Sequence, residues 1–217
     1  MDCVELANDK PYWNYEDVGI FFLALVLIGF VLRLLVRFHF LARSELSNPS
    51  VLLQFLVIAS LTLALYLVLK LRHRRRVLRP LGWIWPCPVY VLVSLIAGTL
   101  LAVGVAFYLR HCHRSIPQIG PMELLFLGVS LGPILEESFF RGCLLPLLAQ
   151  TTGKVGAVIL TALLFAVLHQ PADLVHWLSF TATGVAYGWI RVASRSTAAS
   201  AIMHATYNVS VFFFAAF

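Results

Sequence analysis

Charged residues are scarce in this sequence. Only 12% of its 217 residues are Asp, Glu, Lys or Arg, whereas 60% are hydrophobic and the mean hydropathy is +0.88. A soluble domain usually carries about 25% charged residues, so this composition excludes an ordinary soluble globular domain. The sequence therefore predicts an all-α, polytopic membrane protein, and its length leaves room for one compact helical bundle without a separate soluble domain.

Cysteine is also rare, and internal repeats are absent. Cys3, Cys87, Cys112 and Cys143 show neither a disulfide framework nor the spacing of metal ligands. The run Arg110-His111-Cys112-His113-Arg114 superficially resembles a metal site, but closely spaced ligands between two arginines make a poor zinc site. We therefore interpret this run as a basic loop. The lack of an internal repeat argues against an inverted-repeat transporter.

Long apolar runs, by contrast, are abundant. Seven of them predict membrane-crossing helices, roughly over residues 18–38, 50–71, 89–109, 121–150, 153–169, 174–192 and 197–217. The fourth run is long for one crossing, so it is either tilted or begins as an interfacial helix before Gly132-Pro133. In the sixth run, Gly184 and Gly188 have the small-xxx-small spacing that lets a neighbouring helix approach closely.

Lysine and arginine are distributed unevenly between the two sides that seven crossings define. The side of the N-terminus holds ten: Lys10, Lys70, Arg72, Arg74, Arg75, Arg76, Arg79, Lys154, Arg191 and Arg195. The opposite side holds five: Arg33, Arg37, Arg43, Arg110 and Arg114. This excess predicts a cytoplasmic N-terminus. The net charge of +6 is then explained by basic flanks that contact membrane lipids, and no nucleic-acid partner is expected.

Three ionisable groups, Glu136, Glu137 and Arg141, lie within six residues of one predicted membrane helix. On insertion scales each such group costs about 2.5–3.5 kcal/mol at mid-membrane, so the three must face a partner or a water-filled cavity. On a helix, Glu137 and Arg141 lie one turn apart on the same face and can form an ion pair. Glu136 points about 100° further round the helix. One buried carboxylate is therefore left with spare bonding capacity.

The later apolar runs contain few other groups able to do chemistry. Phe165 and His169 lie at the end of the fifth run, and His204 and Asn208 lie one helical turn apart on the seventh. Each polar group would be costly facing lipid, so we expect them to face one intramembrane cavity together with Glu136. A carboxylate beside a histidine in such a cavity can deprotonate a water molecule. Histidine and asparagine side chains can donate hydrogen bonds to an oxyanion.

The three motifs resemble a known family. Glu136-Glu137-x-x-x-Arg141, Phe165-x-x-x-His169 and His204-x-x-x-Asn208 are similar, in order and in helix assignment, to the signature motifs of the CPBP intramembrane proteases. This family, also called Abi, contains the CAAX proteases and bacteriocin-processing enzymes and includes the type II CAAX prenyl endopeptidases. The resemblance covers about residues 121–217. It divides the chain into an N-terminal region, 1–120, with about three transmembrane helices, and a catalytic core, 121–217.

The resemblance implies a role for each motif residue. Glu136 would be the water-activating base with His169 as its partner, and His204 and Asn208 would form the oxyanion site. The supporting residues would be Glu137, Arg141 and Phe165, the last as part of the cavity wall or as an ordinary core aromatic. The family core has eight spans where seven are counted here. Either one of the runs therefore contains two passes, or the last helix is absent.

Several alternatives remain open at this stage. The same protease could be zinc-dependent, with Glu136, His169 and His204 as ligands, although the preferred mechanism needs no cofactor. A proton-coupled transporter or a peptide-binding scaffold could also use buried Glu and His residues. The expected substrate is a peptide or a membrane protein, lipidated or not. Asp173 and His176 either line the entrance of the cavity or are interfacial polar residues.

Overall fold

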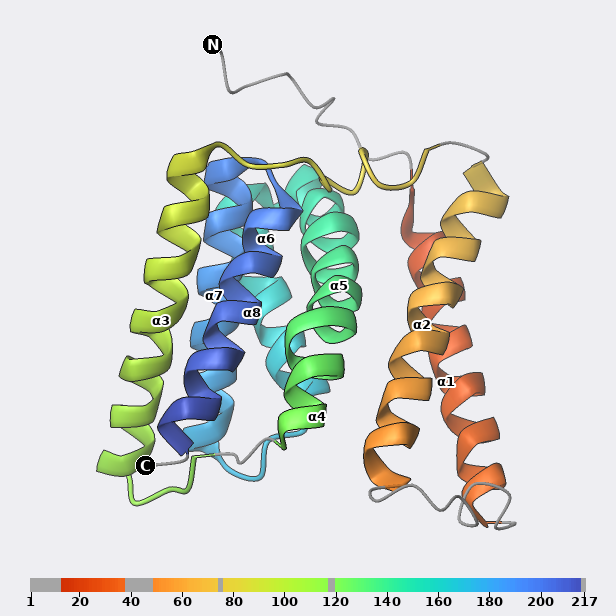
Figure 1. The fold of residues 1–217 in the computed structure, drawn as a ribbon. Helices are drawn as coiled ribbons and strands as arrows, with labels where there is room; N and C mark the ends of the chain where they lie inside the picture. Colours follow the sequence, from red (N-terminus) through yellow and green to blue (C-terminus); the bar gives the residue numbers. More distant parts are fainter. Residues whose placement is uncertain (1–12, 38–48, 74–75, 117–119, 216–217) are drawn as a thin grey trace.

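The computed structural model describes residues 13–37, 49–73, 76–116 and 120–215. These residues form helices joined by short connections and contain no strand, as the sequence predicts. The helices stand roughly side by side, with the pair α1 (Tyr15–Arg37) and α2 (Pro49–His73) at one edge and α3 (Pro88–His111) at the other (Figure 1). Between them lie α4 (Pro121–Glu123), α5 (Gly132–Glu137), α6 (Leu145–Leu168), α7 (Leu174–Ser194) and α8 (Thr197–Ala215), together with the π-helical segments η1 (Leu124–Leu131) and η2 (Ser138–Leu144).

Four helical stretches of the described residues are long and apolar enough to cross a membrane: Gln54–His73, Pro88–His111, Pro121–Leu168 and Thr197–Ala215. They fit an integral membrane protein, but the expected seven or eight crossings are not confirmed. The cytoplasmic N-terminus also stays a prediction. Several side chains that it depends on lie outside the described part: Lys10, Arg33, Arg37, Arg43, Arg74 and Arg75.

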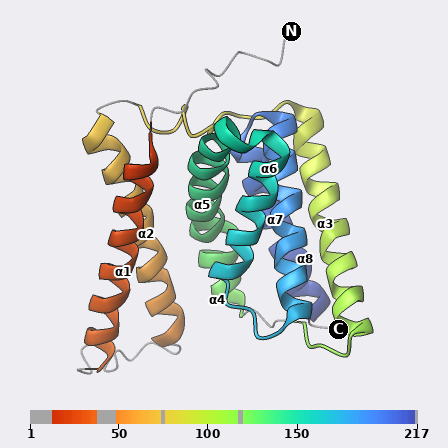
Figure 2. The ribbon, with the colours of Figure 1, turned by 180° about the vertical axis from the view of Figure 1, so that it is seen from behind.

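The fourth and fifth apolar runs form one helical segment that is broken only at Gly153. This residue has φ 70° and ψ 172°, a conformation that glycine adopts without a Cβ clash. In the reverse view the chain rises through α5 and descends through the later part of α6 (Figure 2). Gly132-Pro133 does not end a helix, because η1 passes directly into α5 through an N–H···O bond from Gly132 to Leu127, five residues back.

Two glycines of α7 determine how closely it packs on α6. A Cβ on Gly184 would lie 2.9 Å from Cα of Ala162, and one on Gly188 would lie 3.0 Å from Cγ1 of Val158. Both distances are shorter than ordinary contacts, so only glycine fits without a shift of the helices. The close approach predicted from the small-xxx-small spacing is confirmed. On the other side of the bundle α3 packs along α8, and α8 also contacts η1 and α5.

The α1–α2 pair is anchored to η2 by aromatic side chains. The indole N–H of Trp13 donates to the carbonyl oxygen of Cys143 at 3.0 Å. The ring centres of Phe21 and Phe22 lie 4.7 and 5.5 Å from that of Phe139. Aromatic pairs at these separations add roughly 0.5–1.5 kcal/mol each beyond their burial. These contacts fasten α1 to η2, the segment that directly follows the double glutamate.

Candidate active site

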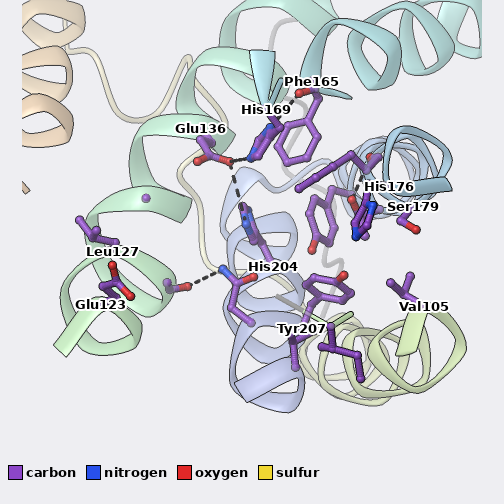
Figure 3. A pocket seen from close by; sticks show the side chains of 18 of the residues that line it. Val105, Glu123, Leu127, Glu136, Phe165, His169, His176, Ser179, His204 and Tyr207 are labelled. Carbon is purple, nitrogen blue, oxygen red and sulfur yellow. Dashed lines mark hydrogen bonds and ion pairs between the residues drawn. The ribbon is translucent and has the colours of Figure 1, made fainter. Parts of the chain in front are cut away.

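Glu136 lies between two histidines in the interior of the bundle (Figure 3). The glutamate comes from α5, His169 directly follows α6, and His204 lies in α8. Oε2 of Glu136 is 3.8 Å from Nε2 of His169 and 4.0 Å from Nε2 of His204, distances too long for direct hydrogen bonds. This oxygen is buried and forms no hydrogen bond with any described residue. The carboxylate is therefore flanked by two imidazoles and bonded to neither.

Each imidazole is held in place through its Nδ1 atom. Nδ1 of His169 lies 2.8 Å from the carbonyl oxygen of Phe165, which can only accept, so Nδ1 carries the proton. Nδ1 of His204 lies 3.0 Å from Oε1 of Glu137 and donates to that carboxylate. Nε2 of each ring then faces Glu136. Three atoms with lone pairs meet here, an arrangement that favours a proton, a water molecule or a cation between them.

The second carboxylate of the motif is in a different environment. Glu137 and Arg141 are completely buried, and NH1 of the arginine lies 3.3 Å from Oε1 of the glutamate, so the predicted ion pair is present. NH2 of Arg141 donates to the carbonyl oxygen of Gly184 at 2.8 Å. Its guanidinium carbon also lies 5.0 Å from the ring centre of Phe165 and 5.3 Å from that of Tyr187, within the range of cation–π attraction. This pair ties η2 to α7.

Aromatic rings pack against both histidines of the site and fix the orientation of each imidazole. Phe165 is 2% exposed, and its ring centre lies 4.3 Å from that of His169. Phe180 stacks on the other side of His169 at 4.5 Å, and Tyr187 stacks on His204 at 4.7 Å. Sequence reasoning missed Phe180 and Tyr187. The available signal was their spacing of seven residues, which puts both on one face of α7.

Asn208 joins α8 to η1. Its Nδ2 donates to the carbonyl oxygen of Gly128 at 2.8 Å. That carbonyl has no helical donor, because Gly132 bonds to Leu127 and Pro133, the next residue, has no N–H. An amide nitrogen carries two hydrogens, so Asn208 has a second one to offer. The side chain lines the same cavity as Glu136.

The cavity has a volume of about 340 Å³, within the usual range of ligand pockets. Five predicted site residues line it: Glu136, Phe165, His169, His204 and Asn208. The remaining wall is largely apolar and includes Ile58 of α2, Val105 of α3, Leu127 of η1 and Phe180 of α7. Residues from both predicted regions of the chain therefore surround the polar groups.

A polar cluster lies beside this cavity, where the loop after α3 meets the start of α7. Nε of Arg114 is 2.7 Å from Oδ2 of Asp173. Hydrogen bonds from the backbone N–H and the ring of His176, with Arg114 alongside, lower the pKa of Asp173 to about 2. His176 lines the cavity, which fits the interpretation that it belongs to the cavity entrance. Asp173 is not part of the lining, which leaves its interpretation as an interfacial polar residue. The basic loop thus has a structural partner that the sequence did not indicate.

The fit to zinc can be judged from distances. Two ligands of a tetrahedral zinc ion with bonds of about 2.0–2.1 Å lie roughly 3.3 Å apart. The two Oε2–Nε2 distances around Glu136 are 3.8 and 4.0 Å, so these side chains would have to move closer to share an ion. No group of three or more His, Cys, Asp or Glu in the described part of the chain is arranged to hold a metal ion.

A carboxylate between two histidines, inside a bundle of apolar helices, can take part in acid–base chemistry. Residues 118–210 match the family described as type II CAAX prenyl endopeptidase Rce1-like, and this stretch contains all three motifs. The predicted resemblance to the CPBP/CAAX proteases is thereby confirmed over this region, which is similar to a family of intramembrane proteases of CAAX type. Comparisons with curated proteins and with solved structures give no match. The division into regions 1–120 and 121–217 stays a prediction.

Proposed function

We propose that this protein is an intramembrane endopeptidase in which Glu136 activates a water molecule without a metal ion. The position of Glu136 supports this proposal best. One of its oxygens is enclosed by His169 and His204, while 24% of the side chain remains exposed. A water molecule held at the exposed part can donate a hydrogen bond to the carboxylate and attack a peptide carbonyl bound in the cavity.

Charge balance supports a proton relay at this site. Glu136, Glu137 and Arg141 together carry one net negative charge when ionised. A proton held between Oε2 of Glu136 and Nε2 of His169 neutralises this charge, and buried clusters favour neutrality. In the proposed reaction Glu136 takes a proton from water, and the proton passes by way of His169 to the leaving amine. The peptide bond is cleaved without a covalent intermediate.

His204 and Asn208 form the proposed oxyanion site. Asn208 offers the second hydrogen of its amide, because the first is used by Gly128. Nε2 of His204 can donate once the ring takes up a second proton, whose charge the negative charge of the oxyanion balances, while Nδ1 stays bonded to Glu137. Donors fixed in advance stabilise the tetrahedral intermediate without reorganisation, and losing one typically costs about 10²–10³ in rate.

The substrate we propose is the end of a membrane-bound peptide or protein, with CAAX-type or leader-peptide processing as the candidate reactions. The experiment is to compare protein termini in membranes that contain the wild type or the Glu136→Gln variant at equal amounts. New termini that appear only with the wild type are expected, and they would name the substrate. Identical sets of termini would contradict the proposal. A scaffold or a proton-coupled transporter would give that result.

A zinc-dependent version of the same reaction is the second candidate, because Oε2 and two imidazole Nε2 atoms converge. Purified protein treated with a strong chelator distinguishes the two versions. We expect cleavage to persist after chelation. Loss of cleavage that added zinc restores would establish the metal-dependent version.

A further inference from the structure

A second cavity lies apart from the active site, where α6 begins and α7 ends. It has a volume of about 220 Å³ and shares no lining residue with the catalytic cavity. Three cationic side chains line it: Lys154, Arg191 and Arg195. The rest of the lining consists of Gln150 and four apolar residues of α6 and α7, and contains no carboxylate.

The backbone brings these cations together in two ways. Gly153, with its positive φ, turns the chain so that Lys154 begins the straight part of α6. Arg195 ends α7 in the left-handed conformation, with φ 56°, one helical turn after Arg191. Non-glycine residues adopt this conformation only at a cost, so the position of Arg195 is specifically determined by the fold.

Two of the three cations, Lys154 and Arg195, are not balanced by a charge of the described residues. Neither Lys154 nor Arg195 forms an ion pair or a side-chain hydrogen bond with any described residue. Like charges that share one cavity repel each other. An anion between these groups would offset the repulsion, and guanidinium groups bind phosphate oxygens in paired, directional hydrogen bonds.

The surroundings indicate where such a phosphate comes from. From Lys154 onward α6 runs into its apolar part, and its outer face exposes Val155 and Ile159. A ligand with its phosphate in the cavity can lay acyl chains along this face. In the predicted orientation the cavity lies on the cytoplasmic side, where anionic lipids are concentrated. We propose that this cavity binds the phosphate headgroup of an anionic phospholipid.

The test uses the purified full-length protein in a neutral detergent. A short-chain phosphatidylglycerol is titrated, and the shift of the unfolding temperature gives the half-saturating concentration. Phosphatidylcholine with the same chains and inorganic phosphate are the comparison ligands. The variant Lys154→Gln/Arg195→Gln removes two charges from the cavity, and Lys70→Gln/Arg76→Gln removes two exposed charges from the basic run elsewhere.

We expect saturable stabilisation by phosphatidylglycerol alone. The half-saturating concentration should rise about tenfold or more in the cavity variant, the usual effect of losing a charge-assisted hydrogen bond, and change less than twofold in the control. If phosphatidylglycerol binding weakens equally in both variants, binding depends on the net charge of the protein and not on this cavity, and the proposal is wrong. Equal saturation by inorganic phosphate would overturn the lipid as the source of the phosphate, and equal saturation by phosphatidylcholine would overturn the preference for an anionic lipid. If the double variant does not fold, the exposed single substitution Lys154→Gln gives the same comparison.

Discussion

Glu136 and Glu137 are adjacent in the sequence and differ completely in their surroundings. Glu137 is fully buried and accepts hydrogen bonds from Arg141 and His204. Glu136 is partly exposed in the cavity and unbonded between two imidazoles. We assign the activation of water to Glu136, and to Glu137 the positioning of Arg141 and His204. Substitutions at the two ends of the motif should therefore affect stability very differently.

Removing the cation of the buried pair tests the supporting role. Arg141→Met keeps an apolar side chain of similar length and leaves Glu137 buried without its arginine. Breaking a buried pair in this way typically costs about 3–5 kcal/mol. We expect a loss of this size in the free energy of unfolding, measured by denaturant titration of the purified protein, together with loss of cleavage.

The double variant Arg141→Met/Glu137→Gln is the matched control. It removes both charges, and Nδ1 of His204 can still donate to the amide oxygen of the new glutamine. Most of the lost stability should return, because an unpaired buried charge is no longer present. A double variant as unstable as the single one would show that the arginine acts through packing on the aromatic rings alone.

The sequence predicted some of these contacts and could not predict others. Helical spacing alone gave the Glu137–Arg141 pair, because residues i and i+4 share a face. The bond between His204 and Glu137 joins residues 67 positions apart and depends on how α8 packs against α5 and η2. Such contacts also determine that Nε2 of each histidine faces Glu136. The spacing of residues along the sequence does not determine this orientation.

At the scale of elements, the close packing of α6 and α7 positions the acceptor for Arg141. Gly184 contributes both the close approach and the carbonyl oxygen that NH2 of Arg141 binds. Gly184→Ala would place a methyl group 2.9 Å from Cα of Ala162. We expect the substitution to separate the helices and to lower the free energy of unfolding by about 1–3 kcal/mol.

Gly104→Ala on α3 is the control for this prediction. A Cβ at Gly104 would meet no atom within 4 Å, so alanine should be neutral or stabilising by up to about 1 kcal/mol. Both variants are compared with the wild type by denaturant titration in the same detergent. Equal effects at the two positions would mean that the contact between α6 and α7 adapts freely.

The course of residues 121–168 was only partly predictable from the sequence. Gly132-Pro133 suggested a helix end, because proline lacks an N–H and usually interrupts a helix. The chain instead passes the proline through a π-helical segment, and Asn208 from a distant helix bonds the carbonyl left open at Gly128. The break lies at Gly153, at the boundary predicted between the apolar runs 121–150 and 153–169. The residues around Gly132-Pro133 do not indicate that Asn208, on another helix, donates a hydrogen bond to Gly128.

At the scale of the whole molecule, Asp173 ties the loop after α3 to the start of α7. Its pKa of about 2 lies below the ordinary value of about 3.9. A lowered pKa in the folded state means that the carboxylate contributes stability above pH 4, and that this contribution is lost as the pH falls from about 4 to about 2. Asp173→Asn should therefore lower the unfolding temperature at pH 5 to 7, and the difference from the wild type should disappear towards pH 2.

The control for this prediction is Arg114→Gln, which removes the ion-pair partner of Asp173 and keeps the hydrogen bonds between Asp173 and His176. This variant should show a smaller loss at pH 7. A loss for Asp173→Asn that does not depend on pH would contradict the assignment.

The overall architecture was predictable where it depends on composition. Scarce charge and long apolar runs predict an all-helical membrane protein, and the three motifs predicted the family that residues 118–210 match. The number of crossings stays a prediction, because hydropathy reports the apolar length of a helix and not its position in a bilayer. Helices that pack in the interior, such as α7, carry polar and small residues on the buried face, which weakens the signal.

The most direct test of the central claim is a single-turnover cleavage assay with purified wild-type protein and the Glu136→Gln variant, on a substrate identified from the new termini. The account predicts that the variant cleaves at least about 100-fold more slowly, because it lacks the general base. Its free energy of unfolding should stay within about 1 kcal/mol of the wild-type value. Unchanged cleavage, or a loss of stability as large as that of Arg141→Met, would contradict the role assigned to Glu136.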